Sequence, residues 1–430
     1  MTSASFFAIK PIRMLITMYW HRIIETSSRR LATAGVIRSE RVPGKRQHAI
    51  HWRVVRTLAA LSLYMSSAPI HAAPYTPAGD HVVLARLPQA QPALAPPTAP
   101  LDLSAALALA RSQIDYASAQ GDPRFLGYAE ATLAPFSQDM SSPAANLLMA
   151  RIEQQRHQFA RARHRLTRLL EQSPNQGQAW LMLANIDRVQ GRLDEARQAC
   201  REAASTLPPT TVLLCQASVQ AITGQREQAY RTLQALASSP AAPQGKSAQW
   251  LDTLSAEMAL QQGRLELATE HLRDALQQAP DDPYLRYLQS DLWLASNQAQ
   301  AVIRDLTNWQ DREGALLRLA IAGQRLNHPQ AQTWRQDYRA RMAADQDTGR
   351  QRHLREHARF LLEVESDPQG ALTLARQNWQ QQRELADLRL LQASAMAADD
   401  QATLSQLQAF IDRYQVDDAQ LTQPAKGASE

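Results

Sequence analysis

The chain has 430 residues, of which 44% are hydrophobic and 20% charged, and it contains only 15 glycines. This composition is typical of a folded protein, and the length allows two or three ordinary domains or one long repeat array. The net charge of +5 would favour nucleic-acid binding if it were spread over the chain. However, residues 1–72 hold eleven of the 46 Lys and Arg and two of the 41 Asp and Glu, so they carry +9 and the rest carries −4. The basic charge belongs to this leader, which excludes a phosphate-binding face on the remaining chain and nucleic acid as its partner.

The leader contains the pattern of an export signal. A positive stretch at 51–56 precedes a short apolar run at 57–65 and small residues at 66–73, which predicts cleavage after Ala72. The 50 residues before this signal indicate an over-long start, with the true start nearer Val42. We therefore expect a periplasmic or secreted protein of a Gram-negative bacterium. The alternative is a cytoplasmic protein that retains residues 1–72.

The mature chain is expected to have no integral membrane segment. The apolar run at 57–65 is too short to span a bilayer, and no later run of about 18 apolar residues follows. Residues 73–100 are rich in Pro and Ala, which predicts an extended linker because proline lacks a backbone donor and stops helices. From about residue 101 the helical pattern continues to 415.

The strongest pattern in the chain is an internal period of 34 residues. One unit reads, in order, Trp180, Leu183, Ala184, Gly191, Leu193, Ala196, Cys200, Ala203 and Pro208. The small residues let two helices approach closely, and the glycine tolerates the left-handed backbone that ends the first helix. The proline cannot continue the second helix. The series therefore predicts a helix–turn–helix unit.

The same series recurs in units that start at Asn146, Leu213 and Asp252. Beyond residue 281 the period weakens, but hairpins are still expected at 282–308, 312–341, 351–381 and 384–415, and a further one at 103–136. We divide the chain into a leader (1–72), a linker (73–100), a degenerate capping hairpin (101–142), four regular units (143–280), degenerate hairpins (281–415) and a disordered tail (416–430).

These residues resemble the tetratricopeptide repeat (TPR) superfamily, closely over 143–280 and more loosely over 103–415. Residues 119–136 and 353–361 also resemble a group of secreted bacterial TPR proteins, whose genes often lie beside a membrane protein of the HupE/UreJ type. The resemblance implies an all-α, right-handed superhelical solenoid of about eight or nine helical hairpins. It also implies an exported location and a membrane protein as partner, but it names no activity.

In such a solenoid each hairpin buries its apolar face against its neighbours, which leaves the concave groove for a protein or peptide ligand. The register of the repeats places six candidate side chains there: Arg151, Gln154, Asn185, Arg188, Trp250 and Glu257. The amide and two guanidinium groups resemble half of a clamp for a peptide's terminal carboxylate, because a guanidinium group matches a carboxylate. Trp250 is the candidate for an exposed aromatic contact. The alternative is an ordinary solvated face.

The two cysteines, Cys200 and Cys215, fall in the second helix of one unit and the first helix of the next. In an oxidising compartment they could form a disulfide between neighbouring repeats. Repeat geometry, however, places Cys200 towards the core and Cys215 near the groove, which favours two free, buried thiols. Both possibilities stay open at the level of the sequence.

Residues 353–357 have the form H-x-x-E-H of inverted zinc peptidases, with His353 and His357 one helical turn apart and Glu356 beside them. Such enzymes need a third ligand, and here the motif lies in an arginine-rich helix of a stacked hairpin. We therefore treat the two histidines as weak metal candidates, and a zinc-dependent hydrolase as an alternative function.

The chain shows no nucleophile elbow, phosphate-binding loop or dinucleotide fingerprint. The sequence therefore predicts a protein that is not an enzyme and needs no cofactor. It would be a scaffold or adaptor that binds a peptide or protein partner for an envelope or membrane complex.

Overall fold

The computed structural model describes residues 92–97, 99–138, 140–347 and 353–421. The predicted leader and most of the linker lie outside these residues. Eighteen α-helices and no strand occur in the described part of the chain, so the predicted all-α fold is confirmed. Within the same residues, no helix is long and apolar enough to cross a membrane.

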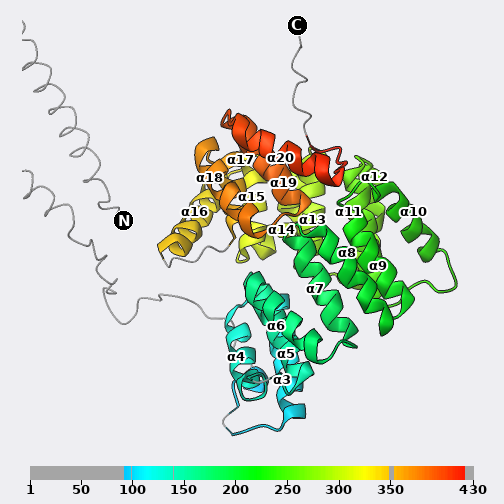
Figure 1. The fold of residues 1–430 in the computed structure, drawn as a ribbon. Coiled ribbons are helices and arrows are strands. Elements are labelled where there is room, and N and C mark those ends of the chain that lie inside the picture. Colours follow the sequence, from blue (N-terminus) through cyan, green and yellow to red (C-terminus); the bar gives the residue numbers. More distant parts are fainter. Residues whose placement is uncertain (1–91, 98, 139, 348–352, 422–430) are drawn as a thin grey trace, which may run out of the picture. The chain divides into compact units, whose positions relative to one another are not determined.

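Consecutive helices pair into hairpins along the described chain (Figure 1). The pairs are α3 (Leu103–Gln120) with α4 (Arg124–Leu133), α5 (Pro143–Gln155) with α6 (Phe159–Gln172), α7 (Gly177–Val189) with α8 (Leu193–Glu202), α9 (Pro209–Gln220) with α10 (Arg226–Ala237), α11 (Lys246–Gln261) with α12 (Leu265–Gln278), α13 (Pro283–Ala295) with α14 (Ala299–Leu306), α15 (Glu313–Leu326) with α16 (Ala331–Asp347), α17 (Leu354–Glu363) with α18 (Pro368–Gln381), and α19 (Leu385–Ala397) with α20 (Gln401–Tyr414).

Alanines at the predicted helix crossings form the middle of the core. Ala196, Ala229 and Ala268 occupy the same place in successive repeats and are 0%, 0% and 2% exposed. A larger side chain at these positions would push the paired helices apart, because protein interiors are close-packed. The 34-residue period in the sequence therefore reflects the positions at which paired helices touch.

The turns between paired helices follow the predicted chemistry, with one exception. Gly191 and Gly263 have φ angles of 72° and 71°, which only glycine adopts without strain. Gly224 does not have a positive φ. A Cβ atom on Gly224 would lie 3.0 Å from the Cβ of Gln415, so the close approach of the C-terminal segment explains the absence of a side chain there.

The C-terminal hairpins return to the regular repeats and bond to their ends. The backbone N–H of Arg383 donates to the carbonyl of Val189 at 2.7 Å, at the end of α7. The N–H of Gly224 donates to the carbonyl of Tyr414 at 3.1 Å, and the N–H of Ala419 donates to that of Gln261 at 2.8 Å. The solenoid is thus closed on itself within the described residues.

Two segments differ from the sequence prediction. The end of the predicted linker forms a short 3-10 helix, η1 (Pro92–Leu94), whose last carbonyl accepts a hydrogen bond from Gln113 at 3.1 Å. The start of the predicted disordered tail, residues 416–421, is bound to the repeats: Val416 and Asp418 are 9% and 7% exposed. Both segments pack side chains against the repeats, and their composition alone does not predict this contact.

Candidate functional site: an inner cluster on the first helices of the repeats

The six predicted groove residues lie on first helices of the hairpins, as expected, but the structure does not bring all of them together. Arg151 on α5 forms an ion pair of 2.7 Å with Asp115 on the neighbouring α3. Gln154, one turn later, is half-buried. Arg151 is therefore part of the packing between the first two hairpins.

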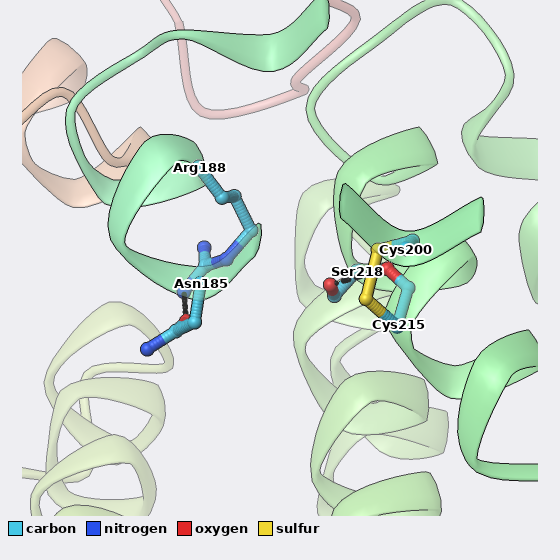
Figure 2. Close-up of a disulfide and its surroundings, with 5 residues drawn as sticks. All are labelled: Asn185, Arg188, Cys200, Cys215 and Ser218. Carbon is cyan, nitrogen blue, oxygen red and sulfur yellow. Dashed lines mark hydrogen bonds between the residues drawn. A yellow bond between two sulfur atoms is a disulfide. The ribbon is translucent and has the colours of Figure 1, made fainter. Parts of the chain in front are cut away.

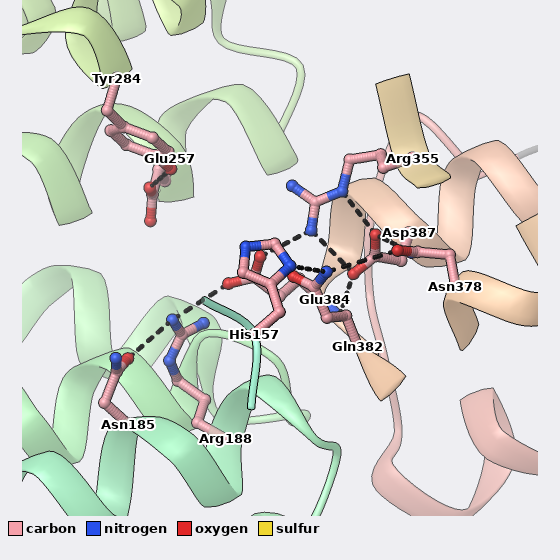
Figure 3. A network of polar contacts seen from close by, with 10 residues as sticks. All are labelled: His157, Asn185, Arg188, Glu257, Tyr284, Arg355, Asn378, Gln382, Glu384 and Asp387. Carbon is pink, nitrogen blue, oxygen red and sulfur yellow. Dashed lines mark hydrogen bonds and ion pairs between the residues drawn. The ribbon is translucent and has the colours of Figure 1, made fainter. Parts of the chain in front are cut away.

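Arg188 on α7 is also paired, and its partner comes from the far end of the sequence. Its guanidinium group donates to the side-chain oxygen of Asn185 at 3.1 Å and to the carboxylate of Glu384 at 3.2 Å (Figure 3). Glu384 is the N-cap residue of α19. The predicted clamp for a peptide's terminal carboxylate is therefore already filled by a carboxylate of the chain itself.

The exposed aromatic residue of this face is Tyr284 rather than Trp250. Trp250 is half-buried and packs against two core clusters, so it is not free for the contact predicted for it. Tyr284, in the first turn of α13, is 55% exposed, and its hydroxyl donates to the carboxylate of Glu257 on α11 (Figure 3). Tyr284 lies one 34-residue period after Trp250, so extending the repeat register would have predicted its position on this face.

We call Arg188, Glu257, Tyr284 and Glu384 the inner cluster. Burial raises the pKa of Glu257, although the Tyr284 hydroxyl and the charge of Arg188 act in the opposite direction. Burial, followed by the charge of Glu257, raises the pKa of Tyr284 well above its usual range. More than half of the tyrosine surface is open. The cluster therefore presents an open aromatic ring beside a carboxylate that is poorly solvated.

Glu257 has no ion-pair partner among the residues that the structure describes, whereas the two other charges of the inner cluster neutralise each other. The next cation, Arg389, which also acts on Glu257, pairs with Asp418 at 2.5 Å. The inner cluster is thus negative overall, and its unpaired charge is a carboxylate. This arrangement favours a cationic group as its ligand, the opposite sign from the predicted clamp.

A second charge network continues from Glu384 into the C-terminal hairpins (Figure 3). Arg355 on α17 donates to Asp387 at 2.5 Å and 2.9 Å and to Glu384 at 2.7 Å, and Asn378 on α18 donates to Asp387 at 2.6 Å. Burial raises the pKa of Glu384, but Arg355 and Arg188 outweigh it and lower the value to about 2. This network connects α7 with α17, α18 and α19, and no motif in the sequence indicated it.

The two cysteines form a disulfide between α8 and α9 (Figure 2). Their Cα atoms lie 5.7 Å apart, and Cys200 and Cys215 are 0% and 2% exposed in one core cluster. The placement of Cys215 near the groove was therefore wrong. Ser218, one turn later in α9, donates its hydroxyl to the carbonyl of Cys215 at 2.7 Å (Figure 2).

The two histidines of the H-x-x-E-H motif lie at the start of α17. His353 is the N-cap of α17 with a φ of 56°, and His357 lies in the first turn of the helix, 3% exposed. Among the described residues, the ligand atoms that gather around His357 belong to Glu313 and Asp345, which precede the motif.

Comparison with known proteins supports the repeat assignment. Residues 147–209 match the family described as Tetratricopeptide repeat. No curated protein matches the chain. Similar solved structures include TTC0263, a thermophilic TPR protein in Thermus thermophilus, with 21% identity over 44% of this chain and 98% of that chain and a TM-score of 0.35.

Two further similar structures have lower sequence identity to this chain than the Thermus protein. The human IFIT1 dimer with m7Gppp-AAAA has 14% identity over 72% of this chain and 80% of that chain, with a TM-score of 0.43. A tetratricopeptide repeat protein from Parabacteroides merdae has 10% identity over 66% of this chain and 98% of that chain, with a TM-score of 0.33. The family match places tetratricopeptide repeats in this chain at residues 147–209.

Proposed function

We propose that this protein acts by binding rather than by catalysis, as an exported scaffold that holds a basic segment of a partner protein in the cell envelope. The observation that carries the proposal is the pair formed by Tyr284 and Glu257: an aromatic ring 55% exposed beside a carboxylate without an ion-pair partner in the described residues. An exposed aromatic next to such a carboxylate is a favourable contact for a Lys or Arg side chain.

The position of the pair also favours a protein ligand. Glu257 and Tyr284 belong to the first helices of two successive hairpins, α11 and α13, and Arg188 on α7 and Glu384 at the start of α19 border them. An extended segment that crosses these helices would meet an aromatic contact, then a carboxylate, then the paired charges. Repeat arrays bind extended segments in this way, because each hairpin supplies one or two side chains to a continuous face.

Changing Glu257 to Gln is expected to remove partner binding without loss of stability. Gln keeps the oxygen that accepts from Tyr284 but removes a charge that burial disfavours, so the melting temperature should stay the same or rise. The matched control is Glu266→Gln, which makes the same change on exposed Glu266 of α12.

The measurement is site-specific photo-cross-linking in the native cell envelope, followed by mass spectrometry. A cross-linker placed at position 284 should capture a discrete partner, and the yield should fall at least about tenfold with Glu257→Gln, because a charge-assisted contact contributes more than about 1.4 kcal/mol. A cross-linker at position 266 should capture none of it. The proposal is wrong if both positions capture the same proteins, or if Glu257→Gln leaves the yield at position 284 unchanged.

Export is supported by the signal pattern at 51–73 and by a disulfide that would persist in an oxidising compartment. We expect the native protein to begin at Ala73, after cleavage behind Ala72, because the small residues there fit the signal peptidase. Mass spectrometry of the native N-terminus checks this. A mature protein that still begins at Met1 or Met18 would contradict export and favour the cytoplasmic alternative.

A further inference from the structure

Three polar atoms outside the inner cluster are buried without a hydrogen-bond partner in the part of the chain that the structure describes. They are Nε2 of His357, Oε1 of Glu313 and the hydroxyl of Tyr338. His357 and Tyr338 are 3% and 0% exposed. Leaving a buried polar atom unpaired is unfavourable, so three such atoms in one neighbourhood indicate a missing ligand.

The geometry of these atoms suits a metal ion. Nε2 of His357 lies 3.4 Å from Oε1 of Glu313, close enough for an ion pair but without hydrogen-bond geometry. One ligand atom each from Glu313, Asp345 and His357 lie within 4.8 Å of one another. Ligands bound to one zinc ion at about 2.0–2.2 Å stand roughly 3.4 Å apart, so a small rotation of the side chains would complete the site.

A fourth ligand is available from the same sequence motif. His353 lies one turn before His357, and its Nε2 is 3.9 Å from the other carboxylate oxygen of Glu313. Its side chain is 46% exposed, so it can turn without disturbing the core. Two imidazoles and two carboxylates favour a late first-row divalent ion over Mg²⁺ or Ca²⁺, which prefer oxygen ligands alone.

The surrounding groups support this role. The aromatic ring of Tyr338 meets the imidazole of His357 edge-on, with 6.0 Å between centroids, and so packs against a proposed ligand. The neighbouring cations do not compete for Glu313, because Arg318 and Arg359 both pair with Asp291.

The geometry points to a zinc-type site formed by Glu313, Asp345 and His357, with His353 as the fourth ligand. These residues come from the start of α15, the last turns of α16, and the start of α17, so the ion would join three consecutive helices at the passage from one hairpin to the next. Its role is to fix the C-terminal hairpins in place. The site is separate from the inner cluster, and its test does not depend on the proposed partner.

Zinc titration of the full chain, without a polyhistidine tag and after treatment with a chelator, tests the site. Calorimetry at pH 7 should show one Zn²⁺ per chain, and Asp345→Asn should weaken the affinity at least about tenfold, because a ligand is lost. His353→Gln, at an exposed position, should weaken it as well. The control His164→Gln, which removes an exposed histidine of α6, should leave the affinity unchanged.

A second measurement on the unaltered chain covers the case in which a variant fails to fold. Co²⁺ should bind at the same stoichiometry, give the intense visible absorption of a four-coordinate ion with nitrogen ligands, and be displaced by Zn²⁺. The site is refuted by the absence of 1:1 binding, by a weak octahedral Co²⁺ spectrum, or by equal Zn²⁺ affinity in Asp345→Asn, His353→Gln and His164→Gln.

Discussion

Replacing Arg355 by Ala is expected to lower the free energy of unfolding of the C-terminal hairpins by about 3 kcal/mol. Arg355 holds both Asp387, whose side chain is 1% exposed, and Glu384, so its removal leaves a buried carboxylate whose remaining donors are Asn378 and the backbone N–H of Glu384, both without a charge. Breaking a buried ion pair from one side is costly because the remaining charge cannot regain its water. The Arg355 side chain is itself 25% exposed, which places the effect at the lower end of the usual range.

Amide hydrogen exchange is the suitable measurement, because hairpins of a repeat array can open separately. We expect the protected amides of α17 and α19 to exchange about 100-fold faster in Arg355→Ala, since about 1.4 kcal/mol corresponds to a factor of ten. The control is Arg231→Ala, which removes an arginine 78% exposed in a pair with Glu227 and should change exchange less than about threefold. Equal effects of the two substitutions would show that the network does not hold the hairpins.

The dependence of stability on acidic pH provides a second test of the same network. The folded-state pKa of Glu384 lies at about 2, below its ordinary 4.5, so its contribution to stability is complete above pH 4.5 and is lost as the pH falls towards 2. In Arg355→Ala the pKa of Glu384 should return towards its ordinary value, because the largest cation acting on it is gone. The loss of stability between pH 4.5 and pH 2 should therefore be smaller in the variant than in the unaltered chain.

Removing the disulfide with Cys200→Ala and Cys215→Ala together is expected to lower the free energy of unfolding by about 3 kcal/mol, the value for a closed loop of about 15 residues. The bond joins α8 to α9, so the effect should be largest at the border between two regular repeats. Urea unfolding with and without a reducing agent is the measurement. The reducing agent should destabilise the unaltered chain by a similar amount and leave the double variant unchanged.

The same bond can be followed in cells. If the protein is exported, neither thiol should react with an alkylating agent until the sample is reduced. Ready labelling of both cysteines in native cells, or an unaltered chain whose urea midpoint ignores reduction, would contradict the disulfide.

Much of the local structure was predictable because the repeat pattern arises from contacts within one hairpin and between neighbouring hairpins. The hairpins expected at 282–308 and 384–415 are found as α13 with α14 and α19 with α20, although the period is weak there. Asn327, with a φ of 50°, ends α15 and forms the turn of the hairpin that was expected at 312–341. Each of these features depends on residues within one hairpin or on the next hairpin along the chain.

The candidate site was predicted only in part. The register placed Asn185, Arg188 and Glu257 on the correct helices, because position within the repeat determines the face of the first helix. It did not show that Arg188 is neutralised by Glu384, 196 residues away, and for this reason we propose a cationic ligand where the sequence predicted a carboxylate. Tyr284 was missed for a simpler reason, since the period was not extended into the first degenerate hairpin.

The sequence by itself determined the helices, their pairing into hairpins and the alanines at their crossings, because the 34-residue pattern encodes short-range packing. Only the tertiary structure decided that the solenoid closes on itself, with Tyr414 reaching the carbonyl of Gly191 across 223 residues. Closure depends on a small rotation between neighbouring hairpins, added over the whole array, and no single repeat specifies that sum. The added rotation brings Glu384 to Arg188, and it leaves Tyr284 and Glu257 as the open part of the inner cluster.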